Sequence, residues 1–399
     1  MSNAIDDVAA ACVRTVQTGS MIVRGTPAFA GWWLGWLSNE FAPHVLTGHA
    51  LSAIPSPLVA KAARMANQRA DKVLNAALTD TFGESYHDQV HHPLEPYTAR
   101  RPHISGVLSA MLSRRESATT NISYGPGGRS HLLDVWKRPD LPEGHRAPVL
   151  IQVPGGAWSV NGKRGQAYPL MSRMVDLGWI CVSINYSRSP WKAWPSHIVD
   201  VKRAIAWVRA NIAEYGGDPE FIAITGGSAG GHLSSLAALT AGDQSLQPGF
   251  EDADTSVQAA APYYGVYDLT DHSGMHHLTL PLLEKLVMRA RMADNRELFE
   301  DASPLFRVHR DAPPFFILHG RNDDIVPLTQ ARAFNSALRD SGAGTVAYAE
   351  LPNAHHGFDT IATLRCQVTT EAVAAFLGIA YGRHVAGARR GRRTRRSAS

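Results

Sequence analysis

Short apolar runs alternate with amphipathic stretches along the middle of the chain. Before these runs, two segments at 119–124 and 131–137 flank a glycine- and proline-rich turn and are expected to pair as antiparallel strands. Six later runs are almost wholly apolar, which is typical of short strands buried on both faces. They lie at 149–153, 179–186, 221–224, 258–264, 315–319 and 346–351.

Helical periodicity appears between these runs. Apolar residues at steps of three and four predict an amphipathic helix that ends near Gly216; they are Ile198, Val201, Ile205, Val208 and Ile212. Further helical stretches are expected at 231–239, 327–341 and 358–379. Apolar strands that alternate with helices predict an α/β fold, with a mostly parallel sheet covered by helices on both faces. Ligands of such sheets bind at the carboxyl ends of the strands.

Three regions of the chain differ in composition. Residues 1–115 are rich in alanine, lack a strand pattern and are expected to form an N-terminal helical extension or cap. Residues 116–382 carry the α/β pattern. Residues 383–399 are rich in glycine, arginine and serine, and are expected to be a basic, disordered tail.

The net charge of +4 comes from that tail alone. Seven arginines and no acidic residue lie beyond position 382, and the other 32 basic residues stand against 35 acidic ones. The body is therefore slightly acidic, which gives no electrostatic reason to expect a nucleic acid as a partner. The three cysteines, Cys12, Cys181 and Cys366, are too far apart for a disulfide scaffold or a zinc ribbon.

The N-terminal region shows no secretory signal and no clear transmembrane helix, so we expect a cytoplasmic protein or one peripherally associated with a membrane or the cell envelope. The segment 25–60 still has only one formally charged residue, and it contains Trp32, Trp33 and Trp36. So apolar a segment is expected to pack over the body, to form a lid, or to contact a membrane surface. The basic tail is a second candidate for contact with anionic lipid.

The sharpest motif, Gly226-Gly227-Ser228-Ala229-Gly230, lies between the strand at 221–224 and the helical run at 231–239. A serine on a sharp strand-to-helix turn projects its hydroxyl outward, and small residues two positions away on each side permit the turn. The N–H of Ala229, at the helix start, then points towards a reacting carbonyl. We therefore expect Ser228 to be a nucleophile.

A nucleophilic serine needs a base, and the base needs a carboxylate to orient it. Where the serine lies on such a turn, the chain order is serine, acid, histidine. Asp323 and Asp324 follow the strand at 315–319, and His355 and His356 follow the strand at 346–351. The residues alone therefore leave two candidates for each role.

A loop of small residues follows the strand at 149–153. Gly155, Gly156 and Ala157 let backbone N–H groups approach a substrate oxygen closely. Together with Ala229, they are expected to form an oxyanion hole.

On these motifs the chain resembles the α/β-hydrolase carboxylesterases and lipases, in particular the bacterial esterases similar to hormone-sensitive lipase. The resemblance covers about residues 116–380 and implies that this region is the catalytic domain. It implies Ser228 as the nucleophile, Asp323 as the acid and His356 as the base, with oxyanion donors at Gly156, Ala157 and Ala229. The motifs that carry it are Pro154-Gly155-Gly156-Ala157-Trp158, Gly226-Gly227-Ser228-Ala229-Gly230-Gly231, His319-Gly320 with Asp323 and Val326-Pro327, and His356-Gly357-Phe358.

One position departs from the family pattern. Pro154 stands where the family usually has histidine, and proline has no side-chain donor with which to hold the glycine loop. The loop therefore needs another means of support.

The sequence predicts a serine carboxylic-ester hydrolase that works through an acyl-enzyme, with a small-molecule or lipid ester as substrate and with no cofactor and no metal. One alternative is a hydrolase of amides, arylformamides or prenylcysteine methyl esters on the same fold. The other is a non-catalytic protein, peripheral to a membrane, that kept the fold.

Overall fold

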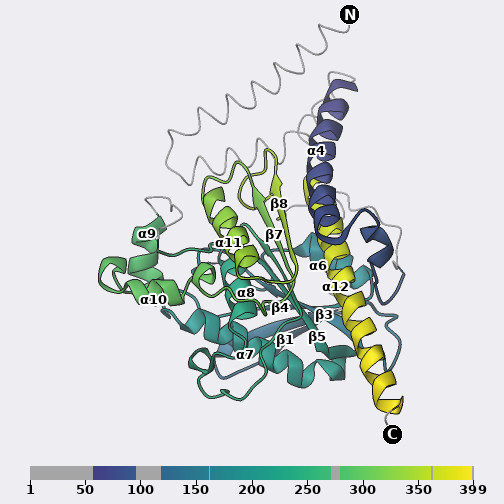
Figure 1. Cartoon of the computed structure of the whole chain (residues 1–399). Coiled ribbons are helices and arrows are strands. Elements are labelled where there is room, and N and C mark those ends of the chain that lie inside the picture. The colour runs from purple at the N-terminus through teal and green to yellow at the C-terminus, as the bar shows by residue number, and fades with distance from the viewer. Residues whose placement is uncertain (1–56, 96–117, 161, 271–278, 361–362, 398–399) are drawn as a thin grey trace, which may run out of the picture.

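A single sheet of eight strands lies at the centre of the computed structural model, which describes residues 57–95, 118–160, 162–270, 279–360 and 363–397 (Figure 1). The strand order is β1-β2-β4-β3-β5-β6-β7-β8. β2 pairs antiparallel with β1 and with β4, and all other pairs are parallel. The strands are β1 (Ala118–Ser123), β2 (Leu132–Trp136), β3 (Ala147–Val153), β4 (Ile180–Ile184), β5 (Gly217–Gly227), β6 (Ala259–Tyr263), β7 (Phe315–Gly320) and β8 (Val346–Leu351).

All eight predicted strands are present, and the first two form the expected antiparallel pair. The largest difference is in β5, which continues into the serine motif as far as Gly227. There Gly226 lies opposite Val153 of β3, and Gly227 lies opposite Tyr263 of β6. This register brings the carboxyl ends of three neighbouring strands, and the loops that follow them, to one place.

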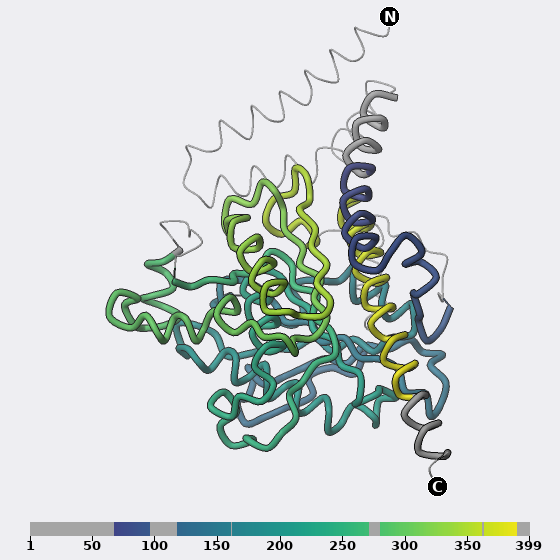
Figure 2. Tube along the Cα trace, in the orientation of Figure 1, coloured from purple at the N-terminus to yellow at the C-terminus, as the bar shows by residue number. Residues whose placement is uncertain are grey.

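Helices cover both faces of the sheet, as the sequence predicts (Figures 1 and 2). One layer packs in a core with Val149, Ile151 and Ile224; it contains α7 (Ser196–Asn211), α8 (Ala229–Leu239) and α11 (Leu328–Asp340). The other packs in a core with Leu150, Ala223 and Leu318; it contains α4 (Pro57–Phe82), α6 (Tyr168–Asp176) and α12 (Leu364–Ser397). The short helices α9 (Thr279–Leu282) and α10 (Arg296–Asp301) lie beside the first layer.

The described part of the N-terminal region belongs to the body. Helix α4 packs beside α12 and β8, with Ala70, Leu74 and Leu78 in the core. Residues 25–56, which include the three tryptophans, lie outside the described residues. Among the described helices, none combines the length and the apolar character needed to cross a bilayer.

The expectation of a disordered tail does not hold for residues 383–397, which continue α12. The preceding turn is tightly packed, since the ring of Tyr381 lies 5.9 Å from that of Trp179 and 5.2 Å from that of Phe221. Gly378 and Gly382 do not interrupt the helix, because they lie where α12 passes close to residues 89–92. Arginine itself favours helix, which lets the last turns continue outward.

Candidate active site

Ser228 occupies a strained turn between β5 and α8. Its φ of 58° and ψ of −122° fall outside the regions that residues with a Cβ ordinarily adopt. Its N–H donates to the carbonyl of Tyr263, 3.0 Å away, and its own carbonyl accepts from the N–H of His232 at 2.9 Å. These bonds fix the serine to β6 on one side and to the first turn of α8 on the other.

The glycines around Ser228 are required by close approach of the backbone. A Cβ at Gly226 would lie 2.6 Å from the carbonyl carbon of Gly230, and a Cβ at Gly230 would fall on the carbonyl oxygen of Val153. The turn is therefore pressed against the end of β3, directly beside the loop that starts at Pro154. The sequence motif thus has the strand-turn-helix setting that a nucleophile elbow needs.

The structure brings Asp323 and His356 into contact. Nδ1 of His356 lies 2.8 Å from Oδ2 of Asp323. The other carboxylate oxygen accepts the N–H groups of Ile325 and Val326, at 2.9 and 2.8 Å. Burial works to raise the pKa of Asp323, but the neighbouring His356 and His319 outweigh it and hold the pKa well below its usual range. Asp323 is therefore an ionised carboxylate that fixes the imidazole by its Nδ1 edge.

The alternative candidates for the base and the acid, His355 and Asp324, form a separate pair with a longer contact. Nδ1 of His355 lies 3.7 Å from Oδ2 of Asp324, whose side chain is 53% exposed. The side chain of Asp323, in contrast, is fully buried. Only the Asp323–His356 pair thus has the short, enclosed geometry of an orienting acid and its base.

Tyr264 joins the imidazole to the serine turn, and sequence reasoning missed it. Its ring centroid lies 4.5 Å from that of His356, and its hydroxyl donates to the carboxylate of Asp359. A Cβ at Gly227 would lie 2.7 Å from the same hydroxyl. The signal in the sequence was faint: a tyrosine at the end of a predicted strand and an aspartate just after His356-Gly357-Phe358.

The expected oxyanion loop has an unusual backbone. Gly156, Ala157 and Trp158 all have positive φ, at 106°, 50° and 55°. No backbone carbonyl of the described residues accepts from the N–H of Gly156 or of Ala157. The N–H of Ala229, the first residue of α8, belongs to the part of a helix that has no intrahelical partner. These three groups are available for a substrate oxygen.

Two side chains replace the support that Pro154 cannot give. Oε1 of Gln166 accepts the N–H of Gly155 at 2.7 Å. The hydroxyl of Tyr186 donates to the carbonyl of Pro154 at 2.9 Å. The start of the loop is thus held by Gln166 at its own far end and by Tyr186 in the segment after β4.

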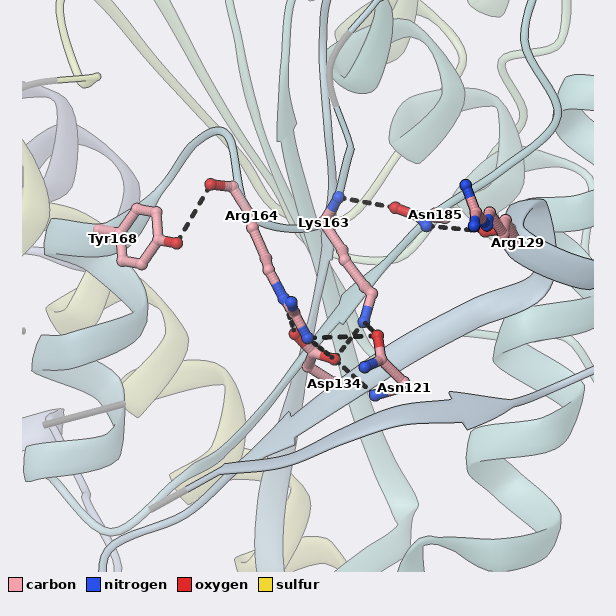
Figure 3. A network of polar contacts seen from close by, with 7 residues as sticks. All are labelled: Asn121, Arg129, Asp134, Lys163, Arg164, Tyr168 and Asn185. Carbon is pink, nitrogen blue, oxygen red and sulfur yellow. Dashed lines mark hydrogen bonds and ion pairs between the residues drawn. The ribbon is translucent and has the colours of Figure 1, made fainter. Parts of the chain in front are cut away.

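A buried charge network holds the far part of this loop against the edge of the sheet (Figure 3). The ammonium of Lys163 bonds the carboxylate of Asp134 in β2 and, at 2.8 Å, Oδ1 of Asn121 in β1. Nε of Arg164 lies 2.8 Å from the other oxygen of Asp134. Asn185 adds a bond from the N–H of Lys163, at 2.9 Å. The loop is therefore anchored to β1 and β2 through one buried carboxylate.

Known proteins resemble this chain over most of its length. The BD-FAE family matches residues 133–338. Esterase LipQ of Mycobacterium tuberculosis is 61% identical over 387 residues, which cover 94% of this chain and 90% of that protein. The probable carboxylic ester hydrolase LipM of the same organism is 52% identical over 332 residues, covering 82% and 76%. A solved truncated form of a carbohydrate esterase from gut microbiota has a TM-score of 0.56 at 27% identity, covering 66% of this chain and 96% of that one.

Proposed function

Since this chain belongs to the BD-FAE family of α/β-hydrolases and is a carboxylic ester hydrolase, we propose that it cleaves acyl esters through a covalent acyl-enzyme on Ser228. His356 is the base and Asp323 orients it. The substrate is an ester of a small molecule or a lipid. No cofactor or metal takes part in this proposal.

The observation that carries the proposal is the contact between His356 and Asp323. Because Nδ1 of His356 is bonded to the carboxylate, we assign Nε2 as the nitrogen that takes the proton of the Ser228 hydroxyl. The serine oxygen attacks the ester carbonyl, and His356 then protonates the leaving alcohol. Water repeats the sequence on the acyl-enzyme and releases the acid. The buried Asp323 stabilises the imidazolium that forms at each stage.

Three backbone N–H groups would receive the negative charge that develops on the carbonyl oxygen. They belong to Gly156, Ala157 and Ala229. Preorganised donors of this kind are each worth roughly 10²–10³-fold in kcat. The fixed backbone at Gly155, supported by Gln166, keeps the donors in place before substrate arrives.

The test combines active-site labelling with turnover. A fluorophosphonate probe should label the wild-type chain and fail to label Ser228→Ala, and kcat for p-nitrophenyl butyrate should fall by about 10⁴–10⁶-fold in that variant. Ser234→Ala, a serine substitution in helix α8, is the matched control, and it should keep both the probe labelling and the kcat of the wild type. Labelling that persists in Ser228→Ala would contradict the proposed nucleophile.

A matched pair of substrates tests the reaction class. The p-nitroanilide of butyric acid carries the same acyl group as the ester but has an amide leaving group. We expect turnover of the ester to exceed that of the anilide by several orders of magnitude. Comparable rates on both would favour an amidase instead.

A further inference from the structure

The positive-φ stretch at 156–158 needs support from outside the loop. Glycine tolerates such a backbone, but Ala157 and Trp158 carry a Cβ and rarely adopt it. Strained residues of this kind persist only where the surrounding structure holds them in place. The bonds at Gly155 and Lys163 hold the two ends of the loop, and neither acts on the strained residues themselves.

Trp158 receives that support at two points: its carbonyl accepts the N–H of Ser189 at 2.8 Å, and its side chain is held by a buried histidine. The indole is 2% exposed, and its N–H lies 3.0 Å from Nδ1 of His232. Nε2 of His232 lies 2.7 Å from the carbonyl oxygen of Ala302. A carbonyl can only accept, so Nε2 must carry the proton, and Nδ1 is left to accept from the indole. Both partners therefore fix one tautomer of His232.

The charge state of His232 suits this role. The imidazole is fully buried, and burial lowers the pKa of His232 to about 4, against the opposing effect of its bond to Ala302 and with a smaller contribution from His197. At neutral pH the ring is uncharged, so Nδ1 keeps the lone pair that receives the indole proton.

His232 also belongs to the helix that begins at the nucleophile. Its backbone N–H donates to the carbonyl of Ser228 at 2.9 Å, while its side chain holds Trp158. One residue therefore connects the serine turn to the loop that carries the oxyanion donors. We propose that His232 is a positioning residue that sets the distance between Ser228 and the N–H groups of Gly156 and Ala157. This inference rests on the proposed function of those groups.

Two substitutions separate the two bonds of the imidazole. The amide oxygen of asparagine can occupy the place of Nδ1, so His232→Asn keeps an acceptor for Trp158. The longer glutamine places its amide near the position of Nε2, so His232→Gln keeps the donor to Ala302 and loses that acceptor. Trp158→Phe removes the indole donor and leaves the histidine intact.

The expected result is a loss of kcat without a loss of binding. In His232→Gln and in Trp158→Phe, kcat and kcat/KM for p-nitrophenyl butyrate should fall together by about 10–100-fold, because donors displaced by a fraction of an ångström act mainly on the transition state. KM should stay within about threefold. His232→Asn should recover most of the rate, and the double variant of Trp158→Phe with His232→Gln should be no worse than either single one.

The matched control is His309→Asn. Nε2 of His309 lies 3.2 Å from the carbonyl of Leu239, at the opposite end of the same helix α8. This variant also removes a bond from a histidine to a backbone carbonyl, and it should leave kcat unchanged. Circular dichroism and thermal unfolding of every variant give the folded fraction by which each rate is corrected.

The outcomes test the nucleophile Ser228 and the positioning role of His232 separately. If Ser228→Ala stays active, the proposed nucleophile is wrong, whatever the other variants do. If Ser228→Ala is inactive while His232→Gln and Trp158→Phe keep kcat within twofold after correction for folded protein, His232 has no positioning role. A rise in KM at constant kcat in His232→Gln would equally overturn it, since it would place the residue in substrate binding.

Discussion

The ring of Tyr264 lies against the imidazole of His356, with centroids 4.5 Å apart and planes inclined by 54°. The hydroxyl of the same tyrosine is bonded to Asp359, so the ring cannot turn away from the histidine without losing that bond. Tyr264 also has a positive φ of 36°, a conformation that a bulky residue adopts only where its surroundings require it. The imidazole is thus held by a carboxylate at one edge and by an aromatic wall on one face.

The contact between the Tyr264 ring and the His356 imidazole predicts a graded effect of substitutions at Tyr264 on kcat. Tyr264→Leu removes the flat surface and should lower kcat by about 10-fold or more, because the imidazole becomes free to rotate away from Ser228. Tyr264→Phe keeps the ring and loses only the bond to Asp359, so its effect should be smaller. Steady-state kinetics on p-nitrophenyl butyrate checks the order. Equal rates in the two variants would show that the ring does not position the base.

The two acid–histidine pairs predict an asymmetry between neighbouring residues. Asp323→Asn and His356→Ala should each lower kcat by about 10⁴-fold or more, because they remove the orienting acid or the base. Asp324→Asn and His355→Ala should lie within about 10-fold of the wild type. The four variants, assayed side by side at pH 8, decide the assignment. A larger loss at Asp324 or His355 would mean that the working pair is the adjacent one.

The depressed pKa of Asp323 predicts a specific loss of stability in acid. Its pKa in the folded state lies below the value of about 4 that an unfolded chain gives. The carboxylate therefore adds stability above about pH 4, and this stability is lost as pH falls towards the folded-state pKa. Urea unfolding of the wild type and of Asp323→Asn from pH 7 to pH 3 should give free energies that converge in acid. Parallel curves over the whole range would contradict this.

The network around Asp134 predicts unequal effects of its two cations. Lys163 is 5% exposed in its side chain, whereas Arg164 is 43% exposed. Lys163→Met removes the buried ammonium that faces the fully buried carboxylate of Asp134. This substitution should cost about 3 kcal/mol in the free energy of unfolding. Arg164→Met weakens a partly solvated pair and should cost about 1 kcal/mol or less. Urea unfolding at pH 7 measures both. Equal losses would show that the two cations share the carboxylate evenly.

Two glycines in α12 predict effects of opposite sign. A Cβ at Gly378 would lie 2.8 Å from Cε1 of His92 and 3.0 Å from Cγ1 of Val90, so Gly378→Ala should destabilise the protein in spite of alanine's better helix propensity. A Cβ at Gly387 would meet nothing within 4 Å, so Gly387→Ala should stabilise it, by roughly 0.5–1 kcal/mol. Thermal unfolding of the two variants checks the contrast. A stabilising Gly378→Ala would place α12 farther from residues 89–92.

The sequence was sufficient to predict the sheet, because six of the eight strands are short apolar runs and the other two flank a turn rich in glycine. It also narrowed the acid and the base to two neighbouring pairs, since loops after parallel strands meet at one edge. The residues alone could not choose within a pair such as Asp323 and Asp324, and only the family resemblance favoured Asp323. That choice depends on which carboxylate turns inward, and it is decided by a neighbour distant in sequence, His356, which lies 33 positions from Asp323.

Other features escaped sequence reasoning for a related reason. The bond between Trp158 and His232 joins residues 74 positions apart, and no local pattern marks it. The last turns of the chain looked disordered because glycine and arginine together resemble a solvated tail. In the structure these turns continue α12 as far as Ser397. Just before them, Gly378 and Gly382 permit close packing of the same helix against residues 89–92, which composition alone does not reveal.

The pairing of α4 with α12 joins two segments that lie near opposite ends of the sequence. During synthesis, α4 emerges before the sheet, but its partner α12 emerges only after all eight strands of the sheet. Until then, one face of the sheet, including Leu150, Phe316 and Leu318, has no complete cover. Apolar surface exposed in this way promotes aggregation of nascent chains. The protein should therefore depend on chaperones most strongly just before α12 is released, and truncations that remove α12 should accumulate as inclusion bodies.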